Sequence, residues 1–255
     1  MTAPARPAAT VIVLREGDHG PEVLLLRRTH SASFFPNAWV FPGGRVEPED
    51  AAVPTTGGDG LPDPSWRPSA VAALRECFEE SGVWLGAGAP TADLRAQLNA
   101  RAAKLTDAPD LVADLDRLRP WAWWITPEEE QKRFDTRFFV ALVPRAAVAE
   151  ADAAETTDHR WLRPAEALSA PGVFLAPPTF RTLEELAALP DLPSVWAAAA
   201  TRPVPPIQPR LIRAGEQTTI LLPGDPEWPS TRPVHGPTRI VWRGSGWRSE
   251  AAPSA

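Results

Sequence analysis

Residues 69–83 read SAVAALRECFEESGV, and this stretch has the spacing of a helix with two different faces. Pro68 before it and Gly82 near its end are typical start and stop signals, so we predict a helix over 69–81. At about 100° per residue, one face is apolar and carries Val71, Leu74 and Phe78. The opposite face is acidic and carries Glu76, Glu79 and Glu80. We therefore expect a helix that buries one face and presents carboxylates on the other.

The three carboxylates converge within about one helical turn, because Glu76 and Glu80 are four residues apart and Glu79 lies between them. Like charges at this spacing repel each other, and a hard divalent cation removes the repulsion by taking carboxylate oxygens as ligands. Arg75, four residues before Glu79, can orient that carboxylate. The alternative is the solvated face of a surface helix, which an isolated Glu-Glu pair would favour.

A second informative stretch, residues 43–50, reads GGRVEPED. Together the two stretches resemble the Nudix box, G-x5-E-x7-R-E-U-x-E-E-x-G-U, in which U is aliphatic. The matching positions are Gly44, Arg75, Glu76, Glu79, Glu80, Gly82 and Val83.

Three departures stand beside this match. Asp50 replaces the first glutamate of the box, and Cys77 takes an aliphatic position. Asp50 and Arg75 are separated by 24 residues where the box has seven, which is an insertion of 17. The insertion falls in a loop, where added length costs little free energy, so we expect the helix and its carboxylates to persist.

The resemblance implies a fold and a reaction. The fold is a Nudix α/β/α sandwich with a mixed sheet, in which the box forms a loop–helix–loop interrupted by the insertion. The reaction is hydrolysis of a diphosphate joined to another moiety, with Mg²⁺ or Mn²⁺ as cofactor. By position in the box, the metal ligands are Glu76, Glu79 and Glu80, and the backbone carbonyl of Gly43 or Gly44 is a further candidate. The catalytic residues are Glu79, Glu76 and Arg75, with the choice of general base left open.

A finer resemblance spans most of residues 11–185 and is to the peroxisomal coenzyme A diphosphatase branch, whose box also carries a long insertion. It rests on LLLRR at 24–28 and RFDTRFF at 133–139. It implies cleavage of CoA or acyl-CoA to 3′,5′-ADP and (acyl)phosphopantetheine. The separate CoA signature with a second arginine is not present, since residues 29–36 hold none. The candidate substrate-binding residues are Arg27, Arg28, Phe41, Gly44, Arg133 and Arg137.

Other interpretations stay open. A different diphosphate, such as ADP-ribose, a nucleotide sugar or a dinucleotide, would use the same carboxylates. A Nudix-fold ligand sensor without turnover is a second alternative, although a pure binder has no need of three clustered carboxylates. The candidate arginines can instead pair with surface acids. Glu155 is a candidate for an extra carboxylate at the site, with a plain surface position as its alternative.

Composition narrows the functional class. The chain has 255 residues and a formal net charge of −6 without a basic run, which argues against nucleic acid as a partner. The single cysteine excludes an internal disulfide, and no apolar run reaches the ~20 residues of a membrane span. The ending Pro253-Ser254-Ala255 is not a peroxisomal signal. We expect a cytoplasmic protein, monomeric or homodimeric, whose partner is a small nucleoside-diphosphate derivative.

The predicted organisation is a Nudix domain over 1–202 and a Pro-rich extension over 203–255 packed on it. The domain contains the insertion 51–68, interpreted as a loop, and extra helices at 91–104 and 109–118 within 91–119. Strands are expected at 11–14, 22–27, 39–41, 121–126, 136–143 and 159–162. Further helices are expected at 164–168, 180–189 and 195–200. The extension holds two strand-like runs, 218–222 and 238–242, which makes it a small β-containing unit.

Overall fold

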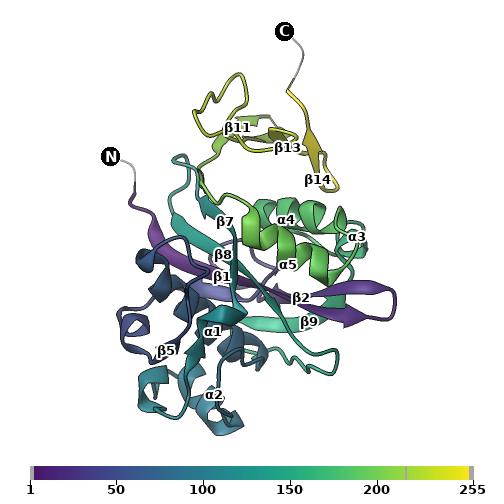
Figure 1. Ribbon diagram of the computed structural model, residues 1–255. Coiled ribbons are helices and arrows are strands. Elements are labelled where there is room, and N and C mark those ends of the chain that lie inside the picture. Colours follow the sequence, from purple (N-terminus) through teal and green to yellow (C-terminus); the bar gives the residue numbers. More distant parts are fainter. Residues whose placement is uncertain (1–2, 216, 253–255) are drawn as a thin grey trace.

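A mixed eight-stranded sheet forms the centre of the molecule (Figure 1). The computed structural model describes residues 3–215 and 217–252; the remaining positions, which include the ending Pro253-Ser254-Ala255, lie outside the described ranges. Six strands follow the order β10-β7-β8-β1-β2-β3, while β4 pairs with β1 and β9 pairs with β2. The strands are β1 (Arg6–Gly17), β2 (Gly20–Arg28), β3 (Trp39–Val40), β4 (Gly43–Arg45), β7 (Arg119–Ile125), β8 (Phe134–Leu142), β9 (Thr156–Leu162) and β10 (Pro206–Ile207).

The register of β1 sets the rest of the sheet. A tight hairpin in which Gly17 pairs with Gly20 joins β1 to β2 in antiparallel fashion. On its other side β1 runs parallel to β8, with Thr10 opposite Phe138. Near its start β1 also pairs with β4, so that Thr10 faces Gly43. This last pairing carries the glycine-rich stretch of the box into the sheet.

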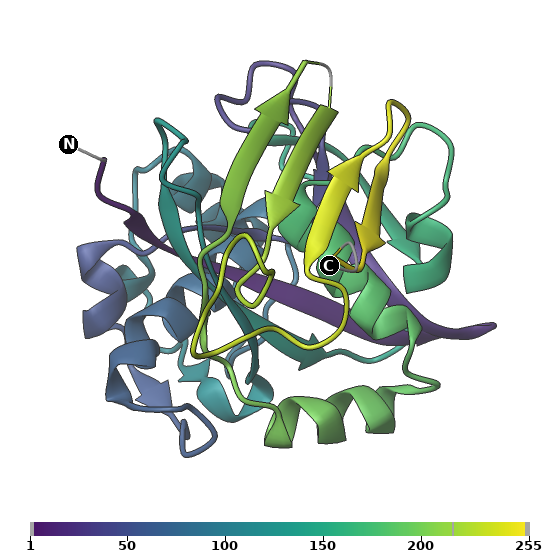
Figure 2. The same ribbon diagram turned by 90° about the horizontal axis from the view of Figure 1, so that it is seen from above.

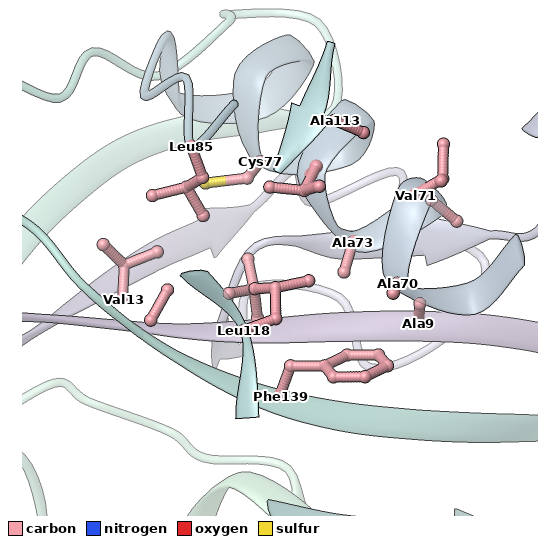
Figure 3. Close-up of a cluster of buried hydrophobic side chains, with 14 of the residues drawn as sticks. Ala9, Val13, Ala70, Val71, Ala73, Cys77, Leu85, Ala113, Leu118 and Phe139 are labelled. Atoms are coloured by element: carbon pink, nitrogen blue, oxygen red, sulfur yellow. The ribbon is translucent and has the colours of Figure 1, made fainter. Parts of the chain in front are cut away.

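Side chains alternate along β1 and β2 and build two separate cores, one on each face of the sheet. On one face Val11, Val13, Leu24 and Leu26 join a cluster with the apolar side of helix α1 (Arg67–Ser81). Figure 3 shows part of this cluster, with Ala70, Val71, Ala73 and Cys77 of α1 packed towards Ala9, Val13 and Phe139. On the other face Ile12, Leu14, Val23 and Leu25 pack in the second cluster.

Helices cover both faces, which confirms the predicted α/β class with a mixed sheet. Helix α1 and the short α2 (Ala92–Asn99) lie on one side, while α3 (Pro164–Ala167), α4 (Pro177–Ala187) and α5 (Leu192–Thr201) lie on the other (Figure 1). Phe180 and Leu183 of α4 and Val195 of α5 are buried in the second cluster. Over 3–215 and 217–252, the structure contains no helix with the length and hydrophobicity needed to traverse a membrane.

Helix α1 is the element that the sequence predicts most directly. It begins at Arg67, two residues before the predicted start, with Pro68 in its first turn, where a missing N–H costs nothing. It ends at Gly82, whose φ of 72° is left-handed and whose N–H donates to the Phe78 carbonyl at 2.8 Å. Val71, Leu74 and Phe78 are buried, as the pattern predicts.

Two predictions around the insertion are wrong. The stretch 51–68, expected to be loop, contains β5 (Thr55–Thr56), the end of the 3-10 helix η1 (Pro48–Ala52) and the 3-10 helix η2 (Pro64–Trp66). The helix expected at 109–118 is instead β6 (Ala113–Asp114) followed by the 3-10 helix η4 (Leu115–Arg117), because β6 pairs in parallel with β5. Leu111, Leu115 and Leu118 are buried as a helix would bury them, so their spacing suggests helix without requiring it. The helix expected at 91–104 ends at Asn99.

The C-terminal residues form a second, four-stranded antiparallel sheet that lies across α4 (Figure 2). Trp247 Nε1 donates to the Leu175 carbonyl at 3.0 Å, and Arg181 Nη2 of α4 donates to the His235 carbonyl at 2.6 Å. Two of its strands, β12 and β13, match the strand-like runs in the sequence, and the structure adds one strand at each edge. Its strands are β11 (Arg210–Ala214), β12 (Gln217–Leu221), β13 (Arg239–Trp242) and β14 (Trp247–Glu250).

A buried carboxylate holds this extension together. Asp225 is fully buried and accepts hydrogen bonds from Arg239 Nε at 2.8 Å and Nη2 at 2.9 Å. It also accepts from Thr238 Oγ1 at 2.9 Å and from the Glu227 N–H at 3.0 Å. The hydrogen-bonded Arg239 guanidinium holds the pKa of Asp225 below its ordinary value of 3.8. The charged form of Asp225 therefore stabilises the folded extension.

Replacing Asp225 with Asn should lower the free energy of unfolding at pH 7 by about 2 kcal/mol, because the Arg239 guanidinium loses its buried charged partner and keeps only the more exposed Glu227. Since the folded pKa lies below the unfolded one, the stabilisation is complete above the unfolded value and is lost as the pH falls through the folded value. The deficit of the Asp225→Asn variant should therefore shrink below about pH 4. Urea unfolding of both proteins at pH 7 and pH 3.5 measures this. Asp18→Asn, at an exposed ion pair with Arg145, is the control. A deficit that is equal at both pH values would contradict the charge-based explanation.

Candidate active site

The acidic face of α1 forms one wall of a cavity of about 290 Å³. The other walls come from η1, from residues 98–106 at and after the end of α2, and from residues 152–155 before β9. Its carboxylates are Glu47, Glu49, Asp50, Glu76, Glu79, Glu80, Asp152 and Glu155. Its cationic side chains are Arg75, Arg101 and Lys104. The lining is therefore strongly acidic, and all three predicted carboxylates of the helix face the same space.

Arg75 ties the two halves of the interrupted box together. Its Nε and Nη2 donate to Asp50 Oδ1 and Oδ2 at 2.8 and 3.1 Å, and both side chains are buried. Nη2 also donates to the Arg45 carbonyl at 2.9 Å. Although burial lowers the pKa of Arg75, its hydrogen bond to Asp50 raises it above the ordinary value, so the guanidinium stays charged. Asp50, which replaces the first glutamate of the box, is thus ion-paired with the box arginine Arg75, although the two are 25 positions apart in the sequence.

The same guanidinium orients two catalytic candidates. Arg75 Nη1 donates to Glu76 Oε1 at 2.9 Å and to Glu79 Oε1 at 3.3 Å. The Glu76 and Glu79 side chains are 14% and 18% exposed, so both still reach the cavity. Arg75 therefore lies behind these carboxylates and limits the directions in which they point.

Glu80 and the glycine pair are held from the opposite direction. Glu80 is 3% exposed, and its Oε2 accepts the Gly43 N–H at 2.9 Å. A Cβ on Gly44 would lie 2.4 Å from the Glu76 carboxyl carbon, so any larger residue here would displace the Glu76 carboxylate from its position. The predicted metal-ligand residues Glu76, Glu79, Glu80 and Gly43 are thus brought together at the junction of β4 and α1.

Burial raises the pKa values of the three carboxylates on α1. Burial raises the pKa of Glu76 to about 7, from an ordinary value near 4.5, against the opposing effect of Arg75. Burial likewise raises the pKa of Glu79, and burial together with the neighbouring Glu76 raises the pKa of Glu80 well above the ordinary value. Within 3–215 and 217–252, no three His, Cys, Asp or Glu side chains are grouped so as to hold a metal ion as they stand. The donor chemistry nevertheless fits a hard divalent cation, because carboxylate oxygens are its preferred ligands and the Arg75 guanidinium is shared among Asp50, Glu76 and Glu79.

Arg133 and Arg137, predicted to bind substrate, lie outside the cavity lining. Arg133 is buried, and its Nε and Nη1 donate to the carbonyls of Thr126 and Ala3 at 3.1 and 2.8 Å. Arg137 lies over the rings of Trp66 and Trp123 and donates to Ser69 Oγ at 3.0 Å. Both arginines thus brace strand β8 and the start of α1 in this structure. Their part in substrate binding stays a prediction.

The other predicted substrate contacts divide between two places. Phe41 is buried in the second core, on the face of the sheet that carries α4, and does not line the cavity. Arg27 is exposed at the end of β2. Arg28 donates through Nε to the Phe34 carbonyl at 3.1 Å, and its charge is close enough to oppose the raised pKa of Glu80. Gly44 lies directly beside Glu76.

Sequence reasoning missed the wall formed by residues 98–106. Asn99, Arg101 and Lys104 line the cavity although no motif marks them, and Asp152 lies beside the predicted Glu155. Asn99 Nδ2 donates to the Glu79 backbone carbonyl at 3.1 Å, which anchors this wall to the catalytic helix. The sequence marks this wall only weakly, through Lys104, which is one of only two lysines in the chain.

The Asp50→Asn variant should lower the free energy of unfolding by about 3 kcal/mol, because it leaves the buried Arg75 guanidinium without its bidentate anion. Urea unfolding at pH 7 measures the loss. Glu49→Gln is the matched control, since Glu49 is the neighbouring acid but its side chain is 39% exposed. Equal stability of the Asp50 variant and the wild type would show that the Arg75–Asp50 pair does not hold the interrupted box together.

Comparisons with known proteins agree with this geometry. The family model of the NUDT19 Nudix domain matches residues 54–186, which include helix α1. The crystal structure of a NUDIX hydrolase from Alicyclobacillus acidocaldarius superposes with a TM-score of 0.68 at 29% identity, covering 80% of this chain and 99% of that one.

Two curated relatives extend the comparison. Putative nudix hydrolase 7 of Caenorhabditis elegans is 31% identical over 202 residues, which are 75% of this chain but 63% of that protein, so the chain spans less than two thirds of its length. Acyl-coenzyme A diphosphatase NUDT19 of Homo sapiens is 26% identical over 287 residues, which cover 88% of this chain and 74% of the human protein. With the family match, the sandwich fold and the carboxylates on α1 in agreement, the chain belongs to the Nudix hydrolases, in the family of the NUDT19 Nudix domain.

Proposed function

We propose that this protein hydrolyses the diphosphate linkage of CoA or an acyl-CoA, with Mg²⁺ or Mn²⁺, to give 3′,5′-ADP and (acyl)phosphopantetheine. The observation that carries the proposal is the set of Glu76, Glu79 and Glu80 around one cavity, with Arg75 fixed behind it by Asp50. Such a site suits chemistry on a phosphate centre, where positioning and charge neutralisation provide most of the catalysis.

The residues that would hold the cation are Glu76, Glu79 and Glu80, with the backbone carbonyl of Gly43. When bound, a divalent cation neutralises the negative charge of the diphosphate and lowers the pKa of water, which supplies a nucleophile at neutral pH. The protein's own part is to point the carboxylates into the cavity, through Arg75 for Glu76 and Glu79 and through the Gly43 N–H for Glu80.

A general base is available among the same groups. Glu76 faces the cavity and accepts a hydrogen bond from Arg75, which makes it one candidate for accepting a proton from an attacking water molecule. Glu79 shares the Arg75 contact and also faces the cavity, so it is the other candidate. Arg75 is a positioning residue, because its donors are directed at Asp50, Glu76, Glu79 and the Arg45 carbonyl.

The relatives support the proposed substrate class. The human, Xenopus laevis and Gallus gallus proteins of the comparison are acyl-coenzyme A diphosphatases, each aligned over 86–88% of this chain. An anhydride between two phosphates carries anionic oxygens. A divalent cation held by the carboxylates would neutralise these oxygens, so that the diphosphate could bind in the acidic cavity.

Mass spectrometry of reaction products tests the substrate directly. Purified protein receives CoA, acetyl-CoA, a long-chain acyl-CoA, ADP-ribose, NADH, a nucleotide sugar or dNTPs, each with Mg²⁺ and with Mn²⁺. We expect 3′,5′-ADP from the CoA compounds. Preferential cleavage of ADP-ribose, a nucleotide sugar or a dinucleotide would retain the chemistry and overturn the CoA assignment. Absence of turnover, with folded protein and bound cation, would favour the ligand sensor.

The Glu79→Gln variant should lower kcat by about 10²–10⁴-fold, because it removes a negative charge and a proton acceptor from the cavity while keeping the shape of the side chain. Its melting temperature should stay close to that of the wild type. Glu166→Gln, at an exposed ion pair with Arg163 on α3, is the matched control and should keep full activity. Near-native turnover by the Glu79 variant in Mg²⁺ would contradict the assignment of Glu79.

A further inference from the structure

The cavity offers an anionic substrate two cationic side chains beyond Arg75. Arg75 directs its donors at Asp50, Glu76, Glu79 and the Arg45 carbonyl, so these protein groups already engage its guanidinium. Arg101 and Lys104 also line the cavity, and their side chains are 80% and 59% exposed. They lie on the wall formed by residues 98–106, which is anchored to the catalytic helix through Asn99.

The backbone at Arg101 is unusual for an arginine. Helix α2 closes with a hydrogen bond from the Ala102 N–H to the Gln97 carbonyl at 2.8 Å and another from the Arg101 N–H to the Leu98 carbonyl at 2.9 Å. This pattern requires a left-handed residue at Arg101, whose φ is 55°, and glycine is the residue that favours this position. A side chain kept at a backbone position that suits glycine better indicates a use for that side chain.

The contacts of Arg101 show that this use is not structural support. Within the described part of the chain, its ion pair is with Glu47 at 4.0 Å, and the Glu47 side chain is itself 37% exposed. A pair that is so exposed and so long contributes little to stability. The wall that carries Arg101 is nevertheless firmly placed, since Arg95 Nε and Asn99 Nδ2 both donate to the Glu79 backbone carbonyl, at 3.0 and 3.1 Å.

We propose that Arg101, assisted by Lys104, binds a phosphate of the substrate that is not part of the hydrolysed diphosphate, namely the 3′-phosphate of CoA. This inference rests on the proposed function and names the specificity residues of the same site. A phosphate monoester carries close to two negative charges and accepts several hydrogen bonds, and a guanidinium meets it with paired donors. Lys104, ion-paired with Glu49 of η1, adds a second exposed positive charge.

The two wall cations suit this phosphate better than the diphosphate. The diphosphate would lie beside Glu76, Glu79 and Glu80, where a divalent cation would neutralise it, whereas Arg101 and Lys104 belong to a separate wall of the cavity, formed by residues 98–106. A group attached at a distance from the scissile bond, such as the ribose 3′-phosphate, can reach that wall while the diphosphate stays at the catalytic helix. Arg101 and Lys104 would then make the enzyme prefer CoA over dephospho-CoA, which lacks only this phosphate.

The Arg101→Gly variant separates ligand binding from folding. Glycine relaxes the left-handed backbone, so the melting temperature should stay the same or rise. The value of kcat/KM for CoA should fall about tenfold, mainly through KM, as expected for one lost charged contact. The value for dephospho-CoA should change by no more than about twofold. Arg101→Lys should keep part of the preference for CoA over dephospho-CoA. Lys104→Ala should also reduce this preference. Arg145→Ala removes another exposed arginine side chain, which does not line the cavity, and is the control.

Calorimetry with the products gives a readout without turnover. In the presence of Mg²⁺, wild-type protein should bind 3′,5′-ADP more tightly than 5′-AMP, and Arg101→Gly should remove this difference. An unchanged preference in the variant, or an equal loss for CoA and dephospho-CoA, would overturn the inference while leaving the proposed function in place. Failure of the wild type to cleave either compound would overturn both.

Discussion

The bidentate ion pair between Arg75 and Asp50 is the interaction on which the rest of the site depends. It joins the start of the interrupted box to its helix across 24 intervening residues, and the same guanidinium then sets the Glu76 and Glu79 carboxylates. Desolvating these charges is expensive, and the cost is met only because each donor of Arg75 has a well-aligned acceptor. Once this pair is in place, the insertion can be long without displacing the carboxylates, since added loop length costs little free energy.

The central sheet provides the rigid support for that arrangement. Strand β1 packs α1 against one face through Val11 and Val13 and simultaneously pairs with β4, which brings Gly43 to Glu80. Helices α4 and α5 seal the other face, and the C-terminal sheet rests on α4. The catalytic helix is therefore held by burial on one side and by backbone contacts on the other. The rest of the cavity is shaped by η1, by residues 98–106 and by residues 152–155.

The sequence predicted what is local. A helix with Glu76, Glu79 and Glu80 on one face, its stop at Gly82 and its apolar side follow from residues within one short window, and the structure has all of them. The partner of Arg75 and the wall with Arg101 depend on chain segments that meet only in the folded state, and no short-range pattern encodes their approach. Arg133 and Phe41 illustrate the converse difficulty, because a cation or an aromatic ring near a motif can equally be needed by the fold. The misassigned helix at 109–118 has the same origin, since pairing of β6 with β5 overrides the helical spacing of its leucines.

A crystal structure of the protein soaked in Mn²⁺, with anomalous diffraction data, tests the central claim most directly. The arrangement of α1 predicts an anomalous peak bounded by the carboxylates of Glu76, Glu79 and Glu80, with the Arg75–Asp50 pair intact behind it. A well-ordered site without such a peak, or a peak on carboxylates elsewhere in the chain, would contradict the assignment of this helix as the metal platform of a diphosphate hydrolase.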